Sequence, residues 1–157
     1  MTHVAFIGLG AMGSGMAANL ARAGRGVRAF DLSAPALERA VQDGCLRAGS
    51  AAEAVRGAEA VVTMLPAGRH VRAVYESEVF DAAEPGAILI DCSTIDVASA
   101  RAVGAAAAER GLAMVDAPVS GGTAAASGGT LTFMVGGTAE AFEQARPYLE
   151  SMGRAVI

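Results

Sequence analysis

The sequence predicts a doubly wound α/β fold, in which a mostly parallel sheet is covered by helices on both faces. Short runs that are apolar throughout alternate with helix-like segments along the whole chain. Strands that lack a polar side are typical of parallel sheets with both faces buried. The 157 residues are 53% hydrophobic and 18% charged, a composition that argues against a disordered chain and a length that suits one domain. We therefore expect a single domain over residues 1–157, with no internal linker or repeat.

Strands and helices are expected to alternate through the first half of the chain. The strands cover residues 3–8, 27–31 and 58–65, and the helices cover residues 11–24, the segment between Ser33 and Gly44, and residues 68–77. Ser33 is a typical N-cap, because its side-chain oxygen can accept a hydrogen bond from a free amide of the first turn, and Pro35 suits that turn.

The second half continues this alternation. Strands are expected over residues 87–92, 112–120 and 129–137, with one more beginning at residue 154, and helices over residues 96–111 and 139–153. Asp96 is the expected N-cap of the first of these helices and Gly111 its stop. Residues 121–128, rich in Gly, Ala and Ser, are expected to form a loop, and the last helix is expected to be interrupted before Pro147.

Composition and charge exclude several classes of function. The net charge is −4, and the 12 basic residues, all arginine, form no basic run, so no nucleic-acid partner is expected. No apolar run approaches the roughly 20 residues of a membrane span, and the first residues lack the pattern of a signal peptide. Cys45 and Cys92 lie far apart, so neither a disulfide nor a metal site is expected. These observations favour a cytoplasmic protein without a membrane partner.

Three glycines mark the end of the first expected strand. Gly8, Gly10 and Gly13 form a Gly-x-Gly-x-x-Gly pattern that follows a strand and opens a helix, which is the Rossmann-type dinucleotide fingerprint. The first glycine takes a tight turn, the second leaves room for a pyrophosphate, and the third lets the helix pack closely on the strand. The amides around Ala11 and Met12 would then face the phosphates at the positive end of the helix dipole.

Asp31 closes the second expected strand, at about the 20-residue distance that follows such a fingerprint. A carboxylate there accepts hydrogen bonds from both ribose hydroxyls of NAD and repels the 2′-phosphate of NADP. The next residues, Leu32, Ser33 and Ala34, include no cation that would hold such a phosphate, so NAD is expected and NADP is less favoured. The alternative is that the glycines serve only turn and packing and that Asp31 is a solvated strand end.

Four further segments are expected at the carboxyl edge of the sheet, where ligands bind in this type of fold. They cover residues 64–66, 91–95, 116–122 and 128–130. The proline of the first would form a wall of the site, and Ser120 with the glycines at 121 and 122 would grip a carboxylate. Structural interpretations remain open: Ser93 and Thr94 as caps of the helix that begins near Asp96, and the two glycines as a turn.

The remaining titratable side chains supply no clear catalytic group. His70 lies just after Pro66, where it would either touch the cofactor or remain solvated, and His3 is expected to be structural. Cys92 has no histidine at a spacing typical of a nucleophilic pair. Asp91 and Asp116 end strands with no evident base beside them.

Four pieces of the sequence together resemble the β-hydroxyacid dehydrogenase family, of the 3-hydroxyisobutyrate dehydrogenase type. The pieces are FIGLGAMGSGMAANL, VTMLP, DCSTI and DAPVSGGTAAASGGTLTFMVGG, in the order and spacing of that family. The resemblance implies the NAD- or NADP-linked oxidation of a short β-hydroxy acid, such as the 3-hydroxyisobutyrate of valine catabolism, to its semialdehyde.

The resemblance also implies roles for individual residues. Those expected to bind the cofactor are Gly8, Leu9, Gly10, Ala11, Met12, Gly13, Asp31, Leu65, Pro66, His70 and Thr94, and those expected to hold the substrate carboxylate are Ser120, Gly121 and Gly122. No residue is expected to bind a metal.

One part of the family's catalytic machinery has no counterpart here. In the family, a lysine on a helix just after this domain acts as general acid and base, and an all-helical C-terminal domain closes the site and builds the dimer. This chain contains no lysine, so that lysine and that domain are expected beyond Ile157, in a full-length protein that is a homo-oligomer. Because losing a well-placed general base costs on the order of 10²- to 10⁴-fold in rate, the chain alone is expected to be inactive.

Two alternatives remain open. A domain without the lysine would serve as a non-catalytic nucleotide-binding or scaffold module. A member of the same family would act instead on tartronate semialdehyde, on 4-hydroxybutyrate or on an imine.

Overall fold

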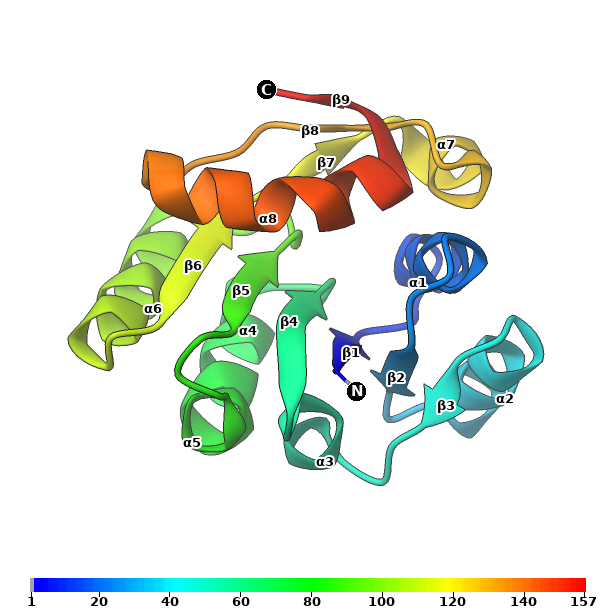
Figure 1. Cartoon of the computed structure of the whole chain (residues 1–157), viewed down its shortest axis with the longest axis horizontal. Coiled ribbons are helices and arrows are strands. Elements are labelled where there is room, and N and C mark those ends of the chain that lie inside the picture. Colours follow the sequence, from blue (N-terminus) through cyan, green and yellow to red (C-terminus); the bar gives the residue numbers. More distant parts are fainter. Residues whose placement is uncertain (1) are drawn as a thin grey trace.

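A six-stranded sheet runs through the centre of the molecule (Figure 1), whose computed structural model describes residues 2–157, the side chain of Ala155 excepted. Its strands are β1 (His3–Ile7), β2 (Val27–Phe30), β3 (Leu46–Arg47), β4 (Ala58–Thr63), β5 (Ile88–Asp91) and β6 (Ala113–Asp116). They are ordered β3-β2-β1-β4-β5-β6, and every neighbouring pair is parallel. This is the strand order of the dinucleotide-binding doubly wound fold, so the predicted fold class is confirmed.

Helices cover both faces of the sheet (Figure 1). One face carries α1 (Gly13–Arg22), α2 (Ala34–Gln42) and α8 (Ala139–Met152), and the other carries α3 (Ala51–Val55), α4 (Gly68–Val74), the π-helical segment η1 (Tyr75–Val79), α5 (Phe80–Ala82) and α6 (Val97–Glu109). Successive residues of β1 alternate between two buried clusters, with Val4 and Phe6 in one and Ala5 and Ile7 in the other. The central strands are mostly apolar because both faces of the sheet are covered.

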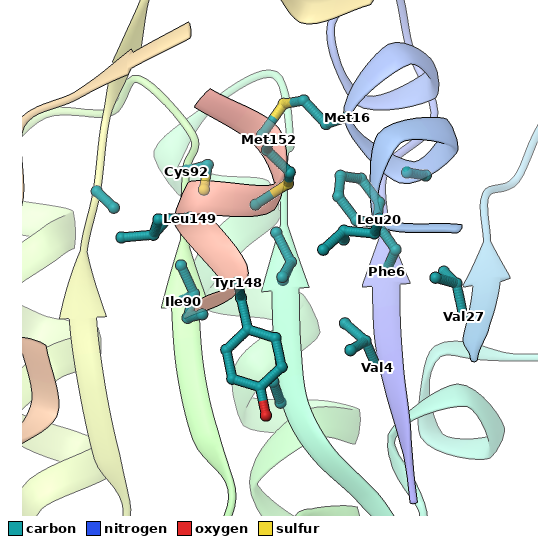
Figure 2. Close-up of a cluster of buried hydrophobic side chains, with 14 of the residues drawn as sticks. Val4, Phe6, Met16, Leu20, Val27, Ile90, Cys92, Tyr148, Leu149 and Met152 are labelled. Atoms are coloured by element: carbon teal, nitrogen blue, oxygen red, sulfur yellow. The ribbon is translucent and has the colours of Figure 1, made fainter. Parts of the chain in front are cut away.

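Figure 2 shows the core beneath α8, where Leu149 and Met152 extend over the central strands and belong to the same cluster as Ile90. The predicted interruption before Pro147 is wrong, because α8 continues through that residue. Pro147 is exposed, whereas Tyr148 beside it is buried. The packing of α8 on the sheet thus holds both halves of the helix, although proline removes one helical hydrogen bond.

The register of the sheet brings the carboxyl ends of five strands to one edge. Ile7 of β1 is paired with Phe30 and with Thr63, and Asp91 of β5 is paired with Thr63 and with Asp116. The strand order reverses between β1 and β4, which is where this fold forms a crevice for a ligand. The segments that follow β1 and β4 therefore border that crevice.

A second sheet lies beside the first and consists of β7 (Val119–Ser120), β8 (Leu131–Phe133) and β9 (Gly153–Val156). The strand predicted over residues 112–120 is wrong in extent, since it divides into β6 and β7 around Pro118, which has no N–H to continue a ladder. The strand predicted over residues 129–137 is reduced to β8. The strand predicted near residue 154 is present, but it pairs with β8 and not with the main sheet.

Residues 121–128 contain a helix, where a loop was the prediction. This helix, α7 (Gly122–Gly128), packs against α1. Asn19 of α1 donates from Nδ2 to the carbonyls of Ala126 and Ser127, over 2.7 and 3.2 Å. These bonds satisfy carbonyl groups that a helix end leaves without partners.

Several short elements escaped prediction from the sequence. Neither β3 nor α3 was predicted, and the helix predicted over residues 68–77 continues without a break through η1 and α5. The predicted N-caps Ser33 and Asp96 are confirmed, because their side chains accept hydrogen bonds from the amides of Ala36 and Ser99.

Candidate dinucleotide-binding site

Two glycines of the turn between β1 and α1, Gly8 and Gly13, have no room for a side chain. Gly8 has a φ of 102°, in the left-handed region that favours glycine, and a Cβ on it would collide with the backbone of Met64. A Cβ on Gly13 would collide with the carbonyl oxygen of Gly8. Turn geometry and packing therefore explain why these two positions are glycine.

Gly10 differs from its two neighbours in the motif. Its φ lies outside the left-handed region, the residue is exposed, and a Cβ built on it would meet no protein atom within 4 Å. Neither backbone conformation nor packing within the chain requires glycine here. The alternative in which the motif serves only turn and packing thus fails at Gly10, and the open space suits a group that approaches the backbone from outside the chain.

A cavity of about 270 Å³ lies over this turn. It is lined by Gly8, Gly10, Ala11, Met12, Gly13, Asp31, Met64, Leu65 and Pro66. The helix α1 begins at this cavity, and its N-cap Met12 offers no side-chain acceptor to the amides of the first turn. Those amides and the positive end of the helix dipole make the position suitable for an anion.

A second cavity, of about 410 Å³, shares Gly8, Asp31, Leu65 and Pro66 with the first. Its other lining residues are Ile7, Phe30, Leu32, Ala51, His70, Ala73, Val74 and Glu78. The lining is mostly apolar, with three polar side chains on Asp31, His70 and Glu78. An apolar slot with a few polar groups is typical of a site for a small-molecule ligand or cofactor.

Asp31 borders both cavities, and two backbone amides hold its carboxylate. The amide of Leu9 donates to Oδ2 over 2.7 Å, and the amide of Ser33 donates to Oδ1 over 2.8 Å. Each carboxylate oxygen can accept a further hydrogen bond. The carboxylate is therefore already oriented to receive a pair of hydroxyl groups.

The wall formed by Leu65 and Pro66 is fastened to β5 by buried hydrogen bonds. The Leu65 amide donates to Ser93 Oγ over 2.8 Å, and Ser93 Oγ donates to Asp91 Oδ1 over 2.6 Å. Ser93 is 1% exposed and binds no amide of α6, whose N-cap bond comes from Asp96. The interpretation of Ser93 as a helix cap is therefore wrong.

Asp91 is the centre of this buried network. Its Oδ1 also accepts a hydrogen bond of 2.8 Å from Thr63 Oγ1, which is itself 2.8 Å from the hydroxyl of Tyr75. Burial raises the pKa of Asp91, while the hydrogen bonds from Ser93 and Thr63 oppose that shift. Neither Thr63 nor Tyr75 was predicted from the sequence to belong to the site. The signal for Thr63 was a hydroxyl at the end of a mostly apolar strand.

The structure brings most of the predicted cofactor residues together, since all of them except Leu9 and Thr94 line one of the two cavities. The Leu9 side chain is buried, and its amide reaches the site through Asp31. Thr94 is exposed in the loop after β5, outside both cavities. His70 lines the second cavity, and its Nδ1 is buried with no hydrogen-bond partner.

The predicted carboxylate-binding segment also lies outside both cavities. Ser120 is exposed at the end of β7, and Gly121 and Gly122, with φ of 129° and 72°, lead into α7. His3 is structural as predicted, with Nε2 2.7 Å from the carbonyl oxygen of Ala54.

Two other features, a cluster of metal-binding side chains and a membrane-spanning helix, are absent from residues 2–157. No group of three or more His, Cys, Asp or Glu side chains in this range is arranged to hold a metal ion. No helix in the same range has the length and apolar character needed to cross a membrane.

Comparison with known proteins agrees with this geometry. Residues 3–157 match the family model described as the NAD binding domain of 6-phosphogluconate dehydrogenase. Two Pseudomonas aeruginosa proteins, named NAD-dependent L-serine dehydrogenase and 3-hydroxyisobutyrate dehydrogenase, are 53% and 50% identical to this chain, over 100% of the chain and 53% of each relative.

A solved structure of Mycobacterium tuberculosis 3-hydroxyisobutyrate dehydrogenase with L-serine has a TM-score of 0.97 and 47% identity, covering 100% of this chain and 54% of that one. The chain thus spans about half the length of the relatives it matches. The resemblance to β-hydroxyacid dehydrogenases is confirmed, and the chain belongs to the family of the NAD-binding domain of 6-phosphogluconate dehydrogenase.

Proposed function

We propose that this chain is the cofactor-binding part of an NAD-dependent dehydrogenase that oxidises a short β-hydroxy acid of the 3-hydroxyisobutyrate type to its semialdehyde. The cofactor part of the proposal rests on Gly10, where the space beside the backbone is open although no packing within the chain requires a glycine. The substrate half is supported by relatives named for 3-hydroxyisobutyrate and for L-serine. In both molecules the primary alcohol carbon is attached to the carbon that bears the carboxylate. That carboxylate-bearing carbon also carries a methyl group in 3-hydroxyisobutyrate and an ammonium group in L-serine.

The two cavities suit different parts of the cofactor. The first, with Gly10 and the amides at the start of α1, suits the pyrophosphate. The second suits adenosine, with the ribose hydroxyls at the oriented carboxylate of Asp31. His70 favours a polar ligand there, because its buried Nδ1 has no partner and such an atom carries a free-energy cost until it is satisfied.

The reacting end of the site is assigned through the resemblance. Thr94 is the proposed neighbour of the nicotinamide, and Ser120, Gly121 and Gly122 are the proposed ligands of the substrate carboxylate. NAD supplies the hydride acceptor for the alcohol carbon, while these residues orient the substrate and restrict its movement. The alcohol proton needs a base, which we assign to a lysine outside residues 1–157, in a C-terminal helical domain that would also build a homo-oligomer.

The preference for NAD over NADP follows from charge. The Asp31 carboxylate would repel a 2′-phosphate, and Leu32, Ser33 and Ala34 place no cation beside it. A cytoplasmic location, expected from the two unpaired cysteines, remains a prediction.

Calorimetric titration of the chain with NAD and NADP, together with a turnover assay on 3-hydroxyisobutyrate and L-serine, tests the proposal. We expect the chain to bind NAD more tightly than NADP, and to turn over slowly or not at all. A longer product of the same gene, carrying the lysine, should reduce NAD with one of the two hydroxy acids. Failure of the chain to bind NAD would overturn the cofactor assignment. Tight binding without turnover by the longer product would favour the non-catalytic alternative.

A further inference from the structure

Glu78 is a polar residue of the second cavity to which neither the motifs nor the proposed function gives a role. It belongs to η1, which continues α4 without a break, and it lines the cavity together with His70 and Asp31. From His70 to Glu78 the helix advances on the order of 12 Å at about 1.5 Å per residue. The cavity therefore follows this helix for roughly two turns, a length comparable with that of an adenosine group.

One oxygen of the Glu78 carboxylate is held by the protein. Oε1 accepts a hydrogen bond of 3.2 Å from the amide of Ala52, in the first turn of α3. Neither of the ion pairs within residues 2–157 includes Glu78. The half-buried Glu78 carboxylate thus borders the mostly apolar cavity and is held in position by the Ala52 amide. It can still accept further hydrogen bonds.

We propose that Glu78 recognises the amino edge of the adenine base and selects adenine over purines that carry oxygen at position 6. This inference rests on the proposed placement of adenosine in the second cavity. The 6-amino group of adenine donates hydrogen bonds, and a carboxylate accepts them strongly because it is charged. An oxygen at the same position accepts only, so the carboxylate would repel it.

The structure also allows a simpler role, in which Glu78 serves only as an extra cap for α3. Ser50 already caps that helix through the amide of Glu53. The Glu78→Gln substitution separates the two roles, because glutamine keeps an oxygen for the Ala52 amide. Its NH₂ group, however, would donate to a 6-oxygen and no longer accept from a 6-amino group.

The test compares the dissociation constants of NAD and of nicotinamide hypoxanthine dinucleotide, which differs in carrying oxygen at position 6 of the purine. We expect the unmodified chain to bind NAD about 10-fold more tightly, as for the loss of one charge-assisted hydrogen bond at a half-exposed site. In Glu78→Gln the ratio should fall to about one or below. Glu76→Gln, an exposed residue of the same segment, is the matched control and should keep the original ratio.

Thermal unfolding of each variant is measured in parallel, and a cap-only role would change the unfolding temperature without changing the ratio. Equal affinity of the unmodified chain for the two dinucleotides would overturn the inference, and so would an unchanged ratio in Glu78→Gln. If the unmodified chain bound neither dinucleotide, the proposed function itself would fall. The two failures are therefore distinguishable.

Discussion

The Gly10→Ala substitution adds one methyl group to the turn between β1 and α1, at a point where it meets no protein atom within 4 Å. Because the backbone of Gly10 is outside the left-handed region, alanine fits without strain. A compatible glycine-to-alanine change raises the free energy of unfolding by about 0.4–1 kcal/mol, through the lower entropy of the unfolded chain. We expect Gly10→Ala to be at least as stable as the unmodified chain.

The same methyl group would occupy the space that the proposed pyrophosphate needs. We expect the affinity for NAD to fall about 100-fold, which corresponds to about 2.7 kcal/mol. Gly8→Ala and Gly13→Ala are the comparison variants, because their Cβ atoms would collide with backbone and Gly8 would also be strained at a φ of 102°. Each should lower the free energy of unfolding by about 2–4 kcal/mol.

Two measurements on each variant check this expectation. Urea unfolding is followed by circular dichroism, because the chain has no tryptophan, and NAD binding is measured by calorimetry. A Gly10→Ala variant that binds NAD as tightly as the unmodified chain would refute the argument that the open space is reserved for the cofactor. A loss of stability as large as that of Gly8→Ala would show that the turn needs glycine for folding alone.

Three further outcomes are expected. Asp31→Ala should weaken NAD binding and bring the dissociation constants of NAD and NADP closer together in paired titrations. Asp31→Asn, which keeps one acceptor oxygen, should lose less affinity for NAD. An unchanged ratio of the two dissociation constants in Asp31→Ala would contradict the role assigned to Asp31. Ser93→Ala should lower the free energy of unfolding in urea by about 2–3 kcal/mol, because it leaves the partly buried Leu65 amide without its partner and removes a donor to the buried Asp91. The exposed Thr94→Ala should change it by less than about 0.5 kcal/mol. Burial raises the pKa of Asp91 from 3.8, so its contribution to stability is present below pH 3.8 and is lost as pH rises through the raised pKa. The unfolding free energy of the unmodified chain minus that of Asp91→Asn should therefore fall as the pH rises above 3.8, and a difference that rises would contradict the burial argument.

The main sheet was predictable because burial on both faces makes most residues of its strands apolar. Five of the six strands, β1, β2, β4, β5 and β6, lie within the predicted ranges and in the predicted sheet. β3 escaped prediction because Leu46 and Arg47 are both exposed, so this two-residue edge strand has no apolar pattern. Its place is set by backbone pairing with β2 and by contacts with α2, where Arg47 pairs with Glu38.

α7 was unpredictable from its own residues. GTAAASG contains two glycines at its ends and has weak local preference for a helix. The helix depends on α1, where Asn19 binds its last carbonyls and where a Cβ on Gly15 would lie 2.8 Å from the amide nitrogen of Ser127. Contacts between α1 and α7, which lie far apart in the sequence, produce no hydrophobic periodicity within the residues of α7.

The candidate site divides along the same line. The positions of the glycines and of Asp31 around one cavity were predictable because they follow from the turn after β1 and from the end of β2. The network of Asp91, Thr63 and Tyr75 was not, because it requires the register that pairs Thr63 with Asp91 across β4 and β5. Two polar residues at the ends of separate strands become partners only when that register is known.

One helix connects the two predicted parts of the site. The start of α1 borders the first cavity through Met12 and Gly13, while Gly15 and Asn19, one turn apart, contact α7 on the same side of the helix. The segment proposed to hold the substrate carboxylate ends where α7 begins. A change in the position of α1 would therefore move the proposed pyrophosphate site and the proposed carboxylate segment together. This arrangement gives a physical reason why the sequence pattern extends past the third glycine into SGMAANL, because those residues connect the candidate cofactor site with the segment that follows β7.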